Sequence, residues 1–171
     1  MKRMPTIVLL AALVLTLALA AACGASAKDR LQSYVNACKP QVEGLNKAMA
    51  GLQDPFSSLS SKKDATWDTA SATLNAAATA IRSAADGFGS ITAPDALKSA
   101  HEQLIVGLRN FDKALGTMRA ALQDGTFGAA TMNDPALNKL LNDGNAKRKA
   151  WKTALEKQCK DLGVTITWKW Q

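Results

Sequence analysis

The residues best suited to chemistry in this chain of 171 residues are one histidine, His101, and three cysteines, Cys23, Cys38 and Cys159. Imidazole and thiolate groups are common ligands of zinc and of haem iron, but four such residues leave little material for a multi-ligand zinc site. The sequence also contains no CxxCH haem-attachment motif, no GxxxxGK(S/T) phosphate-binding loop and no GxSxG nucleophile motif. We therefore predict that the protein is not an enzyme, with no catalytic residue, no metal and no cofactor.

Cys23 follows a segment that is typical of secretory signals. Lys2 and Arg3 give the chain a positively charged start, and residues 6–22 are uncharged and mostly apolar. This run sits at the lower edge of the length that crosses the hydrocarbon core of a bilayer, which is about 30 Å thick. Small residues at its end favour cleavage over a retained transmembrane helix, so we predict a signal peptide over residues 1–22.

The segment that ends this run reads Leu19-Ala20-Ala21-Ala22-Cys23-Gly24. It resembles the lipobox of bacterial lipoproteins, in which signal peptidase II cuts before a cysteine that carries a diacylglyceryl group. The family more often has leucine three residues before the cysteine, where this chain has Ala20. The resemblance implies that Cys23 is the lipidated N-terminus, bearing fatty acids such as palmitate, because stable anchoring needs more than one acyl chain. The alternative is cleavage at Ala25-Ser26-Ala27, which would discard Cys23 and release a soluble protein.

Apolar residues recur at steps of three and four from residue 29 to residue 163, which predicts amphipathic helices. Pro40 lies inside the first predicted helix without shifting its pattern, so we expect one bent helix. The predicted third and fourth helices begin at Pro94 and at Asp134-Pro135. The predicted ends of the four helices are Asp54-Pro55, Gly87 with Gly89, Asp124-Gly125, and Gly163.

Four such helices with short connections favour an all-α fold, an antiparallel up-down-up-down four-helix bundle with a linker at 23–28 and a tail at 164–171. This topology brings Cys38 and Cys159 to the same end of the bundle. Because export implies an oxidising compartment, we predict a Cys38–Cys159 disulfide. His101 falls near the same end, so a metal site of these three residues is an alternative that would need reduced thiolates. The simpler expectation for His101 is a partly buried ring hydrogen-bonded to a neighbour.

The most basic stretch of the chain, whose net charge is +7, contains Lys147, Arg148, Lys149 and Lys152. A solvated helix face is one interpretation. The other is a patch for anionic lipid head groups or for acidic cell-wall polymers. Arg148 beside Gly144 would also suit a small cleft for an anionic ligand. Export and the lack of a recognition motif exclude nucleic acid as a predicted partner.

The tail from residue 164 to residue 171 changes from a helical to an alternating pattern, which is typical of an extended chain. Its apolar members on one side are Val164, Ile166, Trp168 and Trp170. We expect the tail to lie across the end of the bundle, because an isolated strand has no partner among helices. Two alternatives are a membrane contact, with indoles in the interface and Lys169 facing head groups, and addition to the sheet of a partner.

Taken together, the sequence predicts an exported, lipid-anchored helical protein of the cell envelope, held at the cell membrane or the outer membrane with its domain outside the cytoplasm. A non-catalytic binding or scaffolding role is the leading interpretation, with the membrane and an envelope protein or acidic polymer as partners. The alternative is a sensor that holds a ligand or metal in the bundle interior near His101 or Arg148.

Overall fold

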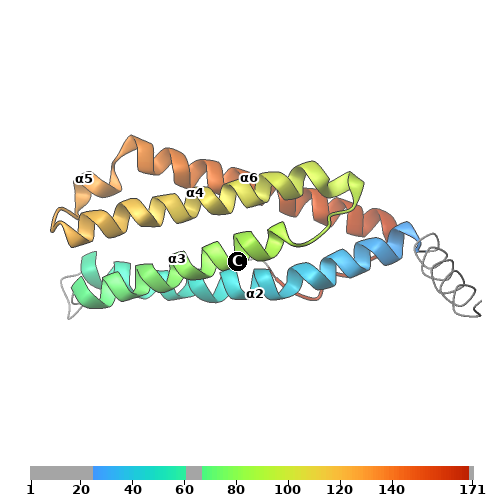
Figure 1. Ribbon diagram of the computed structural model, residues 1–171, viewed down its shortest axis with the longest axis horizontal. Helices are drawn as coiled ribbons and strands as arrows, with labels where there is room; N and C mark the ends of the chain where they lie inside the picture. The colour runs from blue at the N-terminus through green and yellow to red at the C-terminus, as the bar shows by residue number, and fades with distance from the viewer. Residues whose placement is uncertain (1–24, 61–66, 170–171) are drawn as a thin grey trace, which may run out of the picture.

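The computed structural model describes residues 25–60 and 67–169, and every regular element in these two ranges is helical. The elements are α2 (Ala27–Ser60), α3 (Trp67–Gly89), the 3₁₀ turn η1 (Asp95–Leu97), α4 (Lys98–Gln123), the short α5 (Ala129–Met132) and α6 (Pro135–Leu162) (Figure 1). The predicted all-α class is therefore confirmed. The predicted signal peptide, Cys23 and Trp170 lie outside the described residues.

The ends of α6 follow from local chemistry that the sequence displays. At its start, Oδ1 of Asp134 accepts hydrogen bonds from the backbone N–H groups of Ala136 (2.6 Å) and Leu137 (3.2 Å), and Pro135 occupies the first turn. At its end, Gly163 has φ 62°, in the left-handed region that glycine adopts without a steric penalty. The predicted start and end of this helix are confirmed, as are the ends of α3 and α4.

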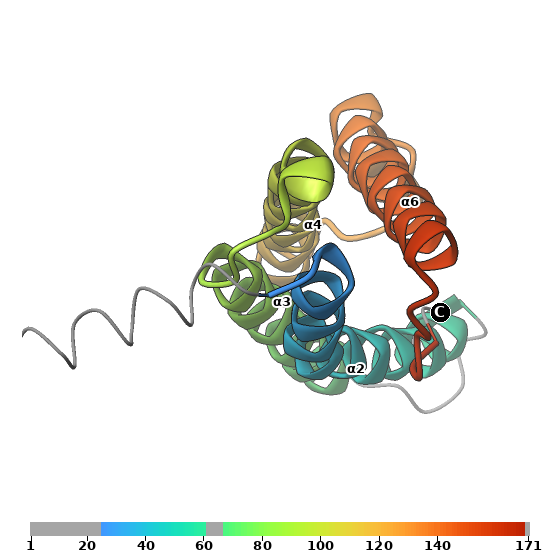
Figure 2. The same cartoon turned by 90° about the vertical axis from the view of Figure 1, so that its right-hand side faces the viewer.

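The first helix differs from the prediction at both ends. It begins at Ala27, inside the predicted linker 23–28, and it continues beyond Asp54-Pro55 to Ser60. A proline inside a helix removes one backbone hydrogen bond and bends the helix, but neighbouring hydrogen bonds can carry the helix onward. Figure 2 shows that α2 changes direction along its length, as expected for a single helix that contains Pro40.

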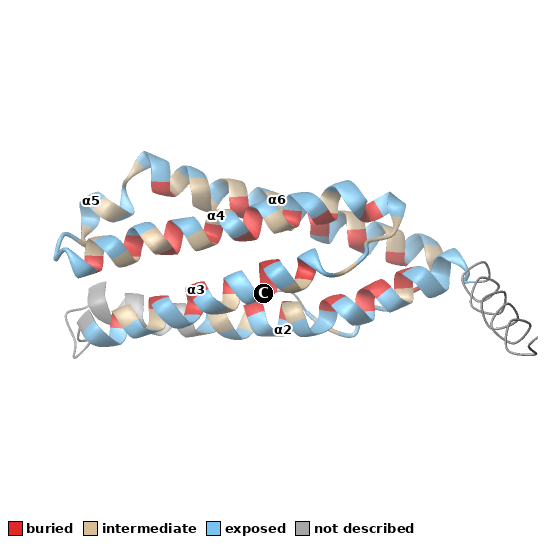
Figure 3. Ribbon diagram, in the orientation of Figure 1, coloured by how far each residue is buried: buried red, intermediate tan, exposed pale blue. Residues whose placement is uncertain are grey.

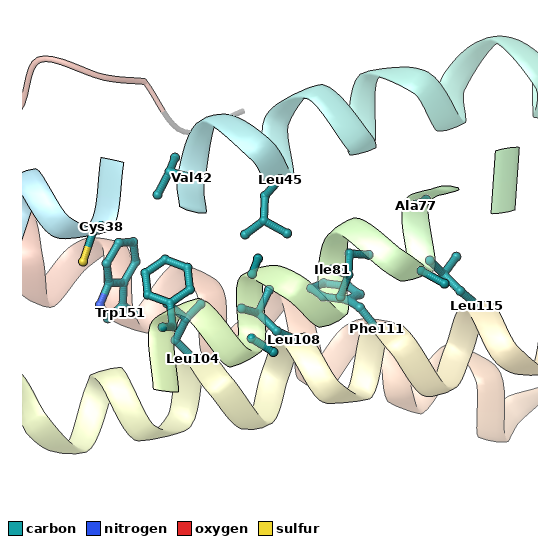
Figure 4. Close-up of a cluster of buried hydrophobic side chains, with 14 of the residues drawn as sticks. Cys38, Val42, Leu45, Ala77, Ile81, Leu104, Leu108, Phe111, Leu115 and Trp151 are labelled. Carbon is teal, nitrogen blue, oxygen red and sulfur yellow. The ribbon is translucent and has the colours of Figure 1, made fainter. Parts of the chain in front are cut away.

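The long helices pack in chain order, α2 against α3, α3 against α4, and α4 against α6, while α2 and α6 touch each other much less. Buried residues follow the faces that these helices turn toward one another (Figure 3). Leu45 of α2, Ile81 of α3 and Leu108 of α4 point into the same apolar core (Figure 4). The line along which α2 and α6 face each other, here called the α2–α6 seam, is the least covered side of this core.

Two glycines let α4 and α6 approach closely. A Cβ atom on Gly144 would lie 2.9 Å from Cζ of Phe111 and 3.0 Å from the carbonyl oxygen of Gly107, and a Cβ on Gly107 would meet the backbone of Gly144 at 3.1 Å. Gly144 therefore interrupts the apolar stripe because another helix occupies the space of its side chain. On the side of Gly144 that faces α4, Phe111 and the backbone of Gly107 fill the space.

Candidate functional site

A buried hydrogen-bonded group connects four of the helical elements at one end of the core. The indole Nε1–H of Trp151 donates to Oη of Tyr34 (2.8 Å), Oη of Tyr34 contacts Nδ1 of His101 (2.8 Å), and Nε2 of His101 contacts the carbonyl oxygen of Phe88 (3.0 Å). These residues lie on α6, α2, α4 and α3. The rings also pack edge to face, with centroids of Phe88 and Trp151 5.6 Å apart.

The acceptors in this group fix where its protons reside. The carbonyl oxygen of Phe88 can only accept, so Nε2 of His101 carries the proton, and Nδ1 of the neutral ring is then the acceptor. Oη of Tyr34 therefore donates to Nδ1 and accepts from Trp151. Every buried side-chain N and O atom in the described part of the chain has a hydrogen-bond partner.

Burial keeps this group uncharged. It lowers the pKa of His101, although the hydrogen bond to Phe88 and the charge of Glu102 act in the opposite direction. Burial likewise raises the pKa of Tyr34 well above its ordinary value. Both ring nitrogens of His101 are engaged and the residue is 5% exposed, so the ring has no nitrogen for a metal or a substrate. The expectation of a buried, hydrogen-bonded His101 is confirmed, and the alternative of a metal site there is wrong.

The predicted Cys38–Cys159 disulfide is wrong, because both cysteines are buried free thiols in the structure. Cys38 lies on α2 and Cys159 on α6, two helices that touch little, and the tail lies in the seam between them. Burial raises the pKa of Cys38 to about 12, partly offset by a hydrogen bond with Tyr34. Among the described residues no group of three His, Cys, Asp or Glu side chains could hold a metal ion.

The tail after α6 packs along the α2–α6 seam. The indole of Trp168 stacks on that of Trp151, with centroids 6.2 Å apart, and its Nε1–H donates to the carbonyl oxygen of Val35 (3.4 Å). Nδ2 of Asn46 donates to the carbonyl oxygen of Lys169 (2.6 Å). Val164 is buried and Ile166 half-buried, while the residues between them are exposed, so the predicted alternation is confirmed over the described residues. The tail forms no strand there.

The tail and the second half of α6 enclose a groove of about 630 Å³, here called the tail groove. This volume lies within the range of about 300–1,000 Å³ that is usual for small-molecule sites. Its apolar lining residues are Trp151, Leu155, Val164, Ile166 and Trp168. Its polar and charged lining residues are Lys152, Glu156, Cys159, Lys160, Thr165 and Lys169. The groove therefore combines an apolar floor with a rim that carries more lysine than glutamate.

The predicted basic stretch is partly neutralised by acidic neighbours on α6. Nζ of Lys147 lies 2.9 Å from a carboxylate oxygen of Asp143, and Nζ of Lys152 lies 3.7 Å from Glu156. The lysine ion pair is the main reason why the pKa of Asp143 is lowered. Arg148 is half-buried, and burial lowers its pKa. Lys149 is exposed. The stretch is thus not a continuous patch of unpaired charge.

The cavity that Arg148 itself lines is small, and an apolar hollow of about 250 Å³ between Met49, Ile81, Phe111 and Leu141 lies next to it. The cavity that Arg148 lines, together with Leu45, Leu108 and Phe111, measures about 20 Å³, which is enough for one water molecule.

Among the described helices, none combines the length and the apolar content that crossing a bilayer requires.

Tyr34 is the central member of the buried hydrogen-bonded group, and the pattern of the sequence did not single it out. It is the only tyrosine of the chain, and it lies between Leu31 and Cys38 at helical spacing, which places it on the core face of α2. A single tyrosine on such a face signals a buried hydroxyl in need of a partner. The identity of that partner depends on how the helices are set against one another along their lengths.

Comparison with known proteins gives no match to a family model, to a curated protein or to a solved structure.

Proposed function

We propose that the protein is a bacterial lipoprotein, exported and anchored to an envelope membrane by lipid on Cys23, with a non-catalytic domain that binds or scaffolds other envelope components. The lipobox-like segment Leu19-Ala20-Ala21-Ala22-Cys23-Gly24 is the basis of the anchor. The tail groove is the basis of the binding role, because it is a hollow of ligand size with a mixed apolar and basic lining.

The N-terminal cap of α2 is the observation that carries the choice of cleavage site. Oγ of Ser26 accepts from the backbone N–H of Asp29 (3.1 Å), and Oδ2 of Asp29 accepts from the backbone N–H of Ser26 (3.1 Å) and from its hydroxyl (2.7 Å). Such a reciprocal capping box stabilises a helix by about 1 kcal/mol. Cleavage after Ala27 would remove Ser26 and this cap, whereas cleavage before Cys23 keeps both. Retention of this cap supports cleavage before Cys23 in this proposal.

We also propose that the four long helices form the antiparallel up-down-up-down bundle, left open along the α2–α6 seam until the tail covers it. Consecutive long helices pack on one another, which supports this arrangement. A Cβ atom on Gly163, just after α6, would lie 3.9 Å from Nζ of Lys28, near the start of α2. The start of α2 and the end of α6 thus belong to the same end of the molecule (Figure 1).

A fatty-acid labelling experiment tests the anchor. Cells that produce the full chain are supplied with labelled palmitate, and the protein is compared with a Cys23→Ser variant and with Cys159→Ala as the matched cysteine control. We expect label and membrane partition in the parent and in Cys159→Ala, and loss of both in Cys23→Ser, because the lipid is attached through that thiol.

The mass of the mature protein gives the outcome that would contradict the proposal. A mature chain that begins at Lys28 and carries no lipid would show cleavage after Ala27. Label that persists in Cys23→Ser would show that another residue carries the lipid.

A further inference from the structure

The tail groove has the two kinds of surface that an amphiphilic molecule needs. Its accessible apolar surface comes from Ile166 and Trp168, which are half-buried, while Trp151 and Leu155 line it as fully buried residues. Burial of each methylene group against such a surface is favourable, so the floor suits a hydrocarbon chain. The opposite wall is the tail, which is held in place by the hydrogen bond from Asn46 to Lys169 and by the stacking of Trp168.

The rim of the groove is positively charged. Lys152, Lys160 and Lys169 line it against a single carboxylate, Glu156, which lies 3.7 Å from Lys152. Lys160 and Lys169 are exposed, and their flexible stems can cover apolar surface while the ammonium groups stay in water. Cys159 adds no negative charge, because burial raises the pKa of its thiol. An occupant of complementary charge has an anionic head.

The groove begins at the end of the molecule to which the anchor would be attached and extends from there along the α2–α6 seam. Gly163, where the tail begins, is beside Lys28 at the start of α2, and farther along the groove Trp168 contacts Val35 and Trp151. Cys23 precedes Ala25 by two residues, which is at most about 7 Å of extended chain. An anchor on Cys23 would hold this end of the groove close to the lipid surface.

We propose that the tail groove binds one anionic phospholipid of the membrane that carries the anchor. The acyl chain lies against the accessible faces of Trp168 and Ile166, and the phosphate is held by Lys160 and Lys169, since lysine binds phosphate as a point charge. This proposal rests on the proposed function, because the anchor supplies the nearness of the membrane. It adds a lipid site that is separate from the covalent lipid.

Quenching of tryptophan fluorescence by brominated lipids tests the site. The full chain carrying Trp67→Phe and Trp170→Phe is incorporated into phosphatidylcholine vesicles that contain either brominated phosphatidylglycerol or brominated phosphatidylcholine. Bromine quenches only indoles close to it, so occupation of the groove quenches the half-buried Trp168. We expect quenching at a lower content of the anionic lipid than of the zwitterionic lipid.

Two double variants separate the groove from general surface charge. Lys160→Gln with Lys169→Gln removes the rim, and Lys98→Gln with Lys113→Gln removes the same charge from exposed positions of α4 that do not line the groove. We expect the rim variant to need roughly tenfold more anionic lipid for half-maximal quenching, because two lysines that face the head group are lost, and the α4 variant to match the parent.

Equal quenching by both lipids would overturn the lipid site, and so would an equal loss of quenching in both double variants. Quenching confined to the chain that retains Trp170 would also overturn it, because it would mean that this indole enters the membrane. The anchor is read independently from the denatured mass of the same samples. A lipidated chain without selective quenching refutes the groove alone, and selective quenching of a chain without lipid on Cys23 refutes the anchor alone.

Discussion

At the scale of single residues, the hydrogen bonds of Tyr34, His101 and Trp151 fix how the helices are aligned along their lengths in the core. Each of its hydrogen bonds joins a different pair of helical elements, so a shift of one helix along another leaves a buried donor or acceptor unpaired. A buried donor or acceptor without a partner lowers the free energy of unfolding by about 1–3 kcal/mol, which is more than an intact hydrogen bond contributes. The group therefore favours one alignment of the helices over others of similar apolar contact.

Protonation of His101 is expected to destabilise the fold. The pKa of His101 is lowered in the folded protein, mainly by burial, whereas in the unfolded chain it is near 6.5. The unfolded chain therefore binds the proton more readily, so the free energy of unfolding is highest above about pH 6.5 and falls as the pH drops toward the lowered pKa. Denaturant unfolding measured at several pH values above and below this point tests the expectation.

A His101→Gln variant is the control, because glutamine can donate and accept hydrogen bonds but does not titrate in this range. Its free energy of unfolding is expected to change less than that of the parent over the same pH interval. The carboxylates titrate in both proteins, so their contribution to the pH dependence is the same. Identical pH profiles for the two proteins would contradict the assignment of the acid sensitivity to this ring.

The sequence predicted that His101 is buried and hydrogen-bonded, but it did not predict Tyr34 or Trp151 as the members of its network. Helical periodicity places a residue on the core face of its own helix. It contains no information about which residue of another helix lies at the same height. The pairing of Tyr34 with Trp151, 117 positions apart, is decided by the packing of whole helices.

At the scale of the elements, the glycine pair Gly107 and Gly144 sets the spacing between α4 and α6. Helices normally pack with axes 8–10 Å apart, at a distance set by the side chains at the contact. Here the two residues that face each other carry no side chain, and the side chains of Phe111 on α4 and Lys147 on α6 lie beside them. The sequence showed Gly144 as a break in a stripe, and the structure explains the break as a close contact.

Gly144→Ala is expected to lower the free energy of unfolding by about 1–3 kcal/mol, because the new methyl group would overlap the ring of Phe111 and the carbonyl of Gly107. The matched control is Gly116→Ala in α4, where a Cβ would meet nothing within 4 Å. The control should be neutral or stabilising by up to about 1 kcal/mol, since alanine favours helix. Denaturant unfolding of both variants measures the contrast, and equal stabilities would contradict the close contact.

The sequence predicted helix ends correctly where a capping side chain or a glycine determines the end. It predicted the end of α2 incorrectly, because proline was the only signal there. The cap of Asp134 and the left-handed Gly163 depend on a few neighbouring residues, so the sequence contains what determines them. Pro40 and Pro55 only weaken a helix, and the outcome depends on packing beyond the segment. The short α5 was missed because it spans a single turn with no apolar period.

At the scale of the whole molecule, the α2–α6 seam is closed by a tail and not by direct helix packing. The tail spans the seam by contacts to both sides, from Trp168 to Val35 on α2 and to Trp151 on α6. The alternating pattern of the tail predicted its buried face, but the groove beside it was not predicted. A groove is the space left between two segments, so it depends on the distance between them.

Trp168→Ala is expected to lower the free energy of unfolding by about 2 kcal/mol, because a half-buried indole that stacks on Trp151 is lost. Thr167→Ala, at an exposed position of the same tail, should leave stability within about 0.5 kcal/mol of the parent. Hydrogen exchange of the amides around Val35 and Trp151 should also become faster in Trp168→Ala alone. Unchanged exchange would contradict a covering role of the tail.

The seam is covered late during synthesis, because the tail follows all of the described helices. A ribosome makes about 5–20 residues per second, so the phenol of Tyr34 exists for roughly 10 seconds before the indole of Trp151, 117 positions later, has been made. Trp168 is made only after all of the described helices. A product that stops short of Trp168 contains these helices yet leaves the seam uncovered, so this side of the molecule is expected to stay open to proteases until Trp168 is in place.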